Sequence, residues 1–233
     1  LIVKLLHRFE LPGKNALLYA LNPLAILELT GNLHFEAFVI FFLLLSVWLL
    51  NLDKIALSAV SFAFAISVKL LPVIFLPIML GVLGWRKAFT FYGVAGMSCV
   101  VLFIPMYDQH VIDGFSQSLS LYFQKFEFNA SFYYLVREYG FWKVGYNTIQ
   151  TTGWKLGVVS GILIVIYSYL AGMSRGRSAF DKLSHGFLFI LTIYFSFSTI
   201  VHPWYITTLL AFSVFTHFRF AVLWTALIFL SYV

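Results

Sequence analysis

Charged side chains are what this sequence has least of. Asp, Glu, Lys and Arg make up only 10% of its 233 residues, against ~25% in typical soluble domains. Hydrophobic residues make up 61% and aromatic residues 20%, which is more apolar surface than a soluble fold can bury. The composition therefore excludes a soluble domain. It predicts an all-α fold, a polytopic bundle of transmembrane helices.

Cysteine and long basic runs are also missing. Cys99 is the single cysteine, so no internal disulfide can form. The net charge is +6, but no basic run exceeds two residues, which argues against a nucleic-acid partner. Cytoplasmic loops rich in Lys and Arg explain the charge better. The chain begins at Leu1 without methionine and ends in an apolar run, so we expect a piece of a longer polypeptide, truncated at the N-terminus.

A short polar stretch, Thr30–Glu36, interrupts the first apolar segments. Residues 15–29 before it are broken at Asn22-Pro23 and are too few to cross a hydrocarbon core of ~30 Å. Residues 35–51 after it form a helix of adequate length. Such broken helices need a protein or water-filled surrounding, and ionisable groups there indicate function. The alternative is a helix-capping turn at the membrane surface.

The apolar run 55–84 indicates a second hairpin. As one helix it would be ~45 Å long, which is too long for a bilayer. The residues Lys69 to Pro72 lie in its middle, and proline breaks a helix. Cations at 54 and 86–87 flank the run, and the positive-inside rule places both on the cytoplasmic side only if the chain reverses. Lys69 would then lie at the tip, facing outward or into a cavity.

Residues 107–152 form the longest polar region, and their acids outnumber Lys and Arg. This favours an external loop within a single transmembrane domain that covers residues 1–233. Apolar side chains recur there at helical spacing and predict an amphipathic helix on the outer surface: Phe115, Leu119, Tyr122, Phe123 and Phe126.

On this topology, uncommon polar residues gather at the outer membrane face as candidate binding residues: His34, Glu36, Lys69, His202 and Tyr205. A lysine at mid-depth costs ~2.5–3.5 kcal/mol, which a phosphate would partly offset. A histidine and a carboxylate can orient sugar hydroxyls or handle a proton. Lys69 snorkelling to headgroups and His202 in an aromatic belt are the alternatives. The convergence favours an anionic amphiphile such as a polyprenyl-phosphate sugar, and no metal site is expected.

Several short motifs follow one another in a recognisable order: Asn22-Pro23-Leu24, Glu28, Gly31-Asn32, His34, Glu36, Val68-Lys69-Leu70-Leu71-Pro72 and His202-Pro203-Trp204-Tyr205. This order resembles the bacterial GT-C superfamily of membrane glycosyltransferases, particularly its mannosyltransferase-like, polyprenyl-phosphate-dependent branch.

The resemblance implies transfer of a hexose, with mannose expected, from a polyprenyl-phosphate sugar to a glycan or lipid acceptor. The enzyme would lie in the bacterial inner membrane among membrane lipid, with its site on the external face. It would be metal-independent or use a loosely held divalent ion, with no other cofactor. The family's catalytic carboxylate lies in the first external loop, so we expect it upstream of Leu1 and assign no catalytic residue. Relatives often have His-Asn-Asp where this chain has His34-Phe35-Glu36.

Two other classes of function remain open. A secondary transporter also uses broken helices, but it predicts inverted repeats and ion-coupled uptake. A polymerase or flippase for lipid-linked glycans would carry more external arginines than Arg137 alone. A purely structural membrane subunit is a third alternative, but it leaves Lys69 and Glu36 unexplained.

Overall fold

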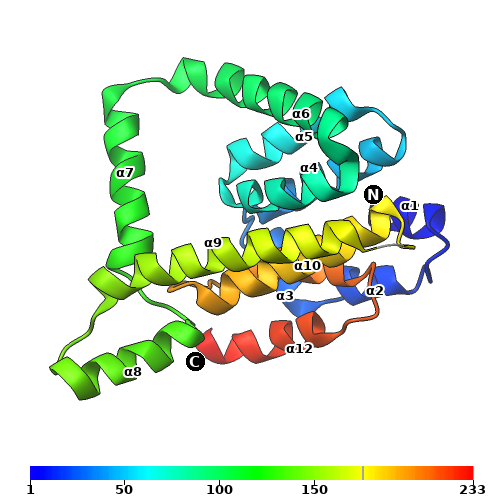
Figure 1. Cartoon of the computed structure of the whole chain (residues 1–233). Helices are drawn as coiled ribbons and strands as arrows, with labels where there is room; N and C mark the ends of the chain where they lie inside the picture. The colour runs from blue at the N-terminus through cyan, green and yellow to red at the C-terminus, as the bar shows by residue number, and fades with distance from the viewer. Residues whose placement is uncertain (175, 233) are drawn as a thin grey trace.

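The structure, a computed structural model, describes residues 1–174 and 176–232, without the side chains of residues 119, 120 and 122–124. Helices account for nearly all its regular structure (Figure 1). Within the described residues, extended pairing is limited to an isolated bridge between Phe128 and Ile200. The prediction of an all-α fold is confirmed.

The first segments contain the predicted break. They are α1 (Ile2–Arg8), α2 (Asn15–Ala20), α3 (Pro23–Ala25), the π-helix η1 (Ile26–Gly31) and α4 (Glu36–Asn51). The Asn22 side chain starts α3 by accepting hydrogen bonds from the backbone N–H groups of Leu24 and Ala25, at 3.0 and 3.3 Å. The helical segments on either side of the polar stretch are bent by 108° relative to each other. Leu33 lies between them with a left-handed φ of 55°, so the chain turns sharply there.

The second predicted break is also present. Helix α5 (Ile55–Val68) ends before Lys69, whose backbone is extended, and the 3-10 helix η2 (Leu71–Phe75) leads into α6 (Leu76–Phe103). Pro72 lies in the first turn of η2, where its missing N–H costs nothing.

Helix α6 reverses direction at Gly84, whose φ of 72° interrupts the helix. The Tyr92 hydroxyl donates to the carbonyl of Leu76 at 2.8 Å, although in a straight helix these residues would be ~24 Å apart. Beside the reversal, Lys87 pairs with Asp53 of the α4–α5 turn, with 2.6 Å between nitrogen and oxygen. The cations at 86–87 therefore lie on the same side as the α4–α5 turn, as the predicted hairpin requires.

The described residues after α6 form eight further elements. They are η3 (Ile104–Met106), α7 (Gln109–Gln124), α8 (Phe132–Val144), α9 (Ile149–Met173), α10 (Ala179–Phe197) and α11 (Tyr205–Ser213), followed by α12 (Phe220–Leu227) and η4 (Ile228–Tyr232). In Figure 1, α9 lies along α10, and α7 runs crosswise between the ends of α6 and α9.

The region 107–152 thus contains the two helices α7 and α8, and its place outside the membrane stays a prediction. Phe115 belongs to α7, whereas the side chains of Leu119, Tyr122 and Phe123 lie outside the described part. Arg175, expected in a cytoplasmic loop, is also outside the described residues.

Among the described residues, Leu71–Met106 and Ile149–Met173 are long and apolar enough in total to cross a membrane, although the first contains the Gly84 reversal. The bent pair Pro23–Gly31 with Glu36–Asn51 is a third candidate if it counts as one span. A continuous apolar core joins α4, α5, α6, α10 and α11. Gly81 of α6 and Gly172 of α9 let those helices touch, because a Cβ built at either would lie 2.7 Å from the Cα of the other.

Candidate functional site

The two chain breaks meet in an ion pair. Lys69 follows the end of α5 and Glu36 is the first residue of α4. The Lys69 ammonium donates to a Glu36 carboxylate oxygen, and Glu36 is only 5% exposed. Lys69 Nζ also lies 3.4 Å from the centroid of the Tyr205 ring, a cation–π contact. Both contacts favour the charged form of this partly buried ammonium.

A stack of three rings lies beside this pair. The indole of Trp204 has His34 on one face, with centroids 4.0 Å apart and planes inclined by 15°. His202 lies on the other face, at 4.4 Å and 7°. The His202 ring also meets the edge of Tyr205 at 5.3 Å. The stack therefore connects the polar stretch to the turn between α10 and α11.

A buried carboxylate, Glu28, holds the other side of His34. It is 0% exposed in η1, and its Oε2 lies 3.1 Å from His34 Nε2. The Asn32 side chain donates to the same oxygen at 3.0 Å, and the Tyr232 hydroxyl donates to Oε1. Burying a carboxylate is costly unless donors surround it, and these donors meet that requirement. π-Helical turns of this kind often mark functional sites.

Burial and charge act together on His202, which lies in the turn between helices. Burial lowers the pKa of His202 below its ordinary value of 6.5, and the positive charge of Lys69 lowers it further, against the opposing effect of Glu36. His202 is therefore neutral near pH 7, with one nitrogen able to accept a hydrogen bond.

A cavity of about 400 Å³ adjoins Lys69, within the usual size range of small-molecule sites. Its lining is mostly apolar and comes from the break after α5 and from α7, α9, α10 and the following turn: Lys69, Leu70, Leu71, Val73, Ile74, Phe115, Ser118, Gly153, Gly157, Ser160, Tyr194, Phe197, Ser198, Thr199, Ile200 and Tyr205. The Ser160 hydroxyl is buried and has no hydrogen-bond partner among the described residues. The cavity thus combines one cation with a long apolar wall.

A polar network outside the core supports the turn beside the cavity. Glu127 accepts from Arg137 at 2.5 Å and from Asn147 at 3.2 Å. Burial opposes its ionisation, but hydrogen bonds from Tyr133, Arg137 and Asn147 outweigh burial and lower the Glu127 pKa below its ordinary value. The next residue, Phe128, donates to Thr199 and accepts from Val201 through its backbone, at 2.9 and 2.8 Å. This bridge fixes the residues just before His202.

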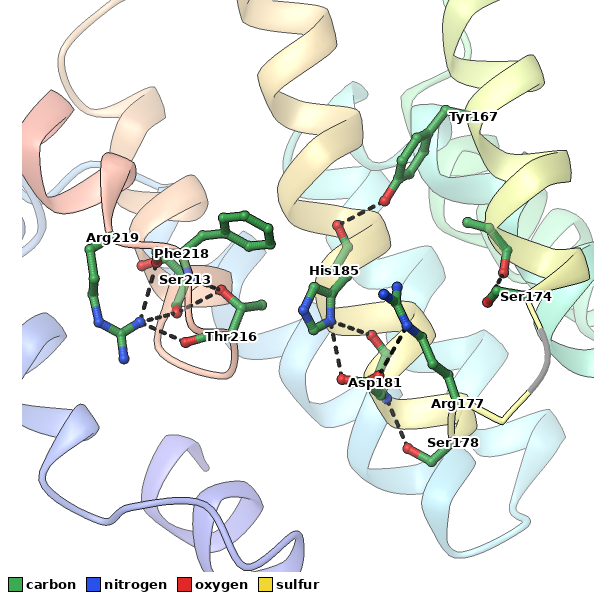
Figure 2. Close-up of polar contacts among 11 residues, drawn as sticks. Tyr167, Ser174, Arg177, Ser178, Asp181, His185, Ser213, Thr216, Phe218 and Arg219 are labelled. Carbon is green, nitrogen blue, oxygen red and sulfur yellow. Dashed lines mark hydrogen bonds and ion pairs between the residues drawn. The ribbon is translucent and has the colours of Figure 1, made fainter.

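A second polar cluster lies at the opposite end of α10 (Figure 2). Asp181 contacts His185 at 3.1 Å and Arg177 at 3.8 Å. Arg219 donates to the carbonyls of Ser213 and Thr216 after α11, at 3.1 and 2.6 Å. The α10 helix between this cluster and His202 is ~28 Å long, close to the thickness of a hydrocarbon core. The candidate site and these cations are therefore at opposite ends of α10.

The structure brings all the predicted binding residues together, although in different roles. Lys69 and Tyr205 line the cavity. Glu36 is covered by Lys69, while His34 and His202 stack beside them on Trp204. No group of three or more His, Cys, Asp or Glu within the described residues is arranged to hold a metal ion.

Glu28 and Trp204 were not predicted as site residues. Glu28 had one signal in the sequence, since it is an acid within an apolar run, four residues before Asn32. Trp204 lay inside a motif already singled out, but only the fold shows that it separates the two histidines.

Comparison with known proteins gives a match to a family model over the first part of the chain. Residues 1–85 match the family model for alpha-(1->6)-mannopyranosyltransferase, N-terminal domain. The matched part contains Glu28, His34, Glu36 and Lys69 and ends beside the Gly84 reversal. No curated protein and no solved structure matches the chain. The match confirms the predicted enzyme class, a glycosyltransferase, and supports a mannosyltransferase.

Proposed function

We propose that the chain is part of an integral membrane mannosyltransferase of GT-C type that takes mannose from a polyprenyl-phosphate donor and transfers it to a glycan or lipid acceptor of the cell envelope. The site would face the outside of a bacterial inner membrane. The matched family makes α-1,6 linkages by its name, and we propose the same linkage here.

The choice of a polyprenyl-phosphate donor rests on one observation: Lys69 lines a mostly apolar cavity. A polyprenyl phosphate has an anionic head on a branched hydrocarbon chain, and the cavity offers a cation beside an apolar wall. An ammonium has three donors, so Lys69 can keep its bond to Glu36 and still donate to a phosphate oxygen. The cavity holds the part of the lipid nearest the phosphate, and the remainder of the chain stays in the bilayer.

The polar wall beside the cavity suits the sugar. His34, His202 and Tyr205 offer ring nitrogens and a hydroxyl next to Lys69, and such groups orient hydroxyls by hydrogen bonding. A transporter or a flippase gains no specific support from this arrangement.

The direct test places the full-length protein in membranes with radiolabelled polyprenyl-phosphate-mannose. Label should pass to a glycan or lipid acceptor only when the protein is present. If no label moves, and other sugar-lipid donors also fail, the transferase assignment is wrong.

Variants of the ion pair test the donor site. Lys69→Met combined with Glu36→Gln removes both charges and leaves neither buried alone. Because a hydrogen bond to a charged group contributes ~1.5–3 kcal/mol, we expect the donor KM to rise by ~10- to 100-fold. Lys155→Ala is the matched control, since Lys155 lies in α9 against Trp154, 6.0 Å from its ring centroid and away from the cavity lining. An unchanged donor KM in the double variant would remove Lys69 from the phosphate site.

A further inference from the structure

The contact between Glu28 and His34 fixes which ring nitrogen carries the proton. A carboxylate only accepts hydrogen bonds, and Glu28 Oε2 lies 3.1 Å from His34 Nε2, so that nitrogen must be protonated. In the neutral ring, Nδ1 is then an acceptor with a free electron pair. Within the described part of the chain, Nδ1 makes no hydrogen bond. The arrangement of a buried acid, an oriented imidazole and a free ring nitrogen is that of a general base.

The surroundings of His34 favour the charge that such a base acquires. The indole of Trp204 covers one face of the ring at 4.0 Å, and the electron-rich face of an indole attracts cations. Glu28 supplies a negative charge at the ring edge, and its other oxygen is held by Tyr232. The His34 side chain is 27% exposed, so a substrate hydroxyl can reach it.

Resting on the proposed function, we propose that His34 is the general base of the sugar transfer and that Glu28 is its positioning residue. The acceptor oxygen attacks the anomeric carbon of the donor, and its proton passes to His34 Nδ1. The bond between the anomeric carbon and the phosphate oxygen breaks, and polyprenyl phosphate leaves with the electron pair. The Lys69 ammonium stabilises the negative charge of the leaving phosphate. This places the base of the transfer among the described residues.

The other charged groups around the rings do not replace His34 in this role. His202 lies across Trp204, and burial and the Lys69 charge lower its pKa and so weaken it as a base. Glu36 is engaged by Lys69. Glu28 itself is enclosed by Asn32, His34 and Tyr232, so it cannot reach a substrate.

Initial rates at varied donor concentration test the proposal, with full-length protein in membranes and radiolabelled polyprenyl-phosphate-mannose. His34→Gln should lower kcat by ~10²- to 10⁴-fold, the usual contribution of a general base, while the donor KM changes less than about threefold. Added imidazole should restore part of the rate of His34→Ala, which a purely structural role would not allow.

Glu28→Gln keeps the shape of the side chain and one accepting oxygen but removes the charge. We expect a loss of kcat of about 10-fold or more without a matching change in donor KM. Thr225→Val is the matched control, because it breaks the 2.8 Å bond from Asn22 to Thr225, which joins the same two parts of the chain without touching His34. Its kcat should equal that of the wild type.

The outcomes separate the two proposals. If the wild type transfers no label, the proposed function fails. If the wild type is active and His34→Gln keeps the wild-type kcat, the base lies elsewhere. If His34→Gln does not fold, an unchanged kcat in Glu28→Gln would overturn the positioning role.

Discussion

Lys69 and Glu36, 33 positions apart in the chain, form an ion pair that joins the tips of the two broken hairpins. Each residue stands beside a break, one after α5 and one at the start of α4. A broken helix exposes unpaired backbone groups, and an ion pair between the breaks holds both in place. The site is therefore built where regular structure stops.

The effects of substituting Lys69 and Glu36 on the free energy of unfolding should be strongly coupled. Lys69→Met leaves Glu36 buried without its partner, and removing one member of a buried pair typically costs ~3–5 kcal/mol. Because the Lys69 side chain is 26% exposed, we expect a value at or below the lower limit of this range. Adding Glu36→Gln should recover part of the loss. Thermal unfolding of the purified protein and its variants measures this, and additive losses would show that the pair contributes no coupling.

The contact of α6 with α9 predicts a sharp difference between two glycines of the same helix. Gly172→Ala would place a Cβ 2.7 Å from the Cα of Gly81, whereas a Cβ at Gly161 meets nothing within 4 Å. We expect Gly172→Ala to lower stability by ~1–3 kcal/mol through overpacking. Gly161→Ala should be neutral or slightly stabilising, because alanine favours helix. Equal melting temperatures for the two variants would contradict the helix contact.

His202 should make the protein less stable in mild acid. Its pKa is lowered in the folded state, first by burial and then by Lys69, so the unfolded chain binds the proton more readily. The stabilisation is present above the ordinary pKa of about 6.5 and is lost as the pH falls below it. His202→Gln should reduce the drop in melting temperature between about pH 7.5 and pH 5.5. The same drop in both proteins would show that His202 does not titrate in this way.

The lowered pKa of Glu127 leads us to expect a further loss of stability at a pH below the range in which His202 acts. Its hydrogen bonds outweigh burial and lower its pKa from the ordinary 4.5, so its contribution is present above that value and disappears as the pH falls through the lowered pKa. Glu127→Gln should be less stable than the wild type at pH 7 and should lose less stability between about pH 5 and pH 3. Circular dichroism melts over this range provide the measurement. Glu138→Gln, on the exposed side of Arg137, is the control.

Much of the layout was predictable because it follows from lengths and charges. An apolar run too long for a bilayer, a proline in its middle and cations at both ends were enough to predict the hairpin around Lys69. The polar stretch at Gly31–Glu36 was likewise recognisable as a break. These features are local, so a single sequence contains them.

The partners of the site residues were not predictable, because they depend on pairing between distant segments. A phosphate was expected to offset the buried charge of Lys69, but Glu36 already does so. Glu28 was given no role in the site, although its partners include Tyr232 at the other end of the chain. Apolar helices of similar composition can pack in many registers, and only the packed structure selects one.

The bonds from Asn22 to Thr225 and from Tyr232 to Glu28 have a consequence for biosynthesis. The ribosome completes η1 long before it makes η4, so Glu28 lacks the Tyr232 donor while the chain is being made. Until residues 225–232 are made, the nascent chain has an incompletely paired acid at Glu28. Chaperones or the insertion machinery can bind the chain in that state.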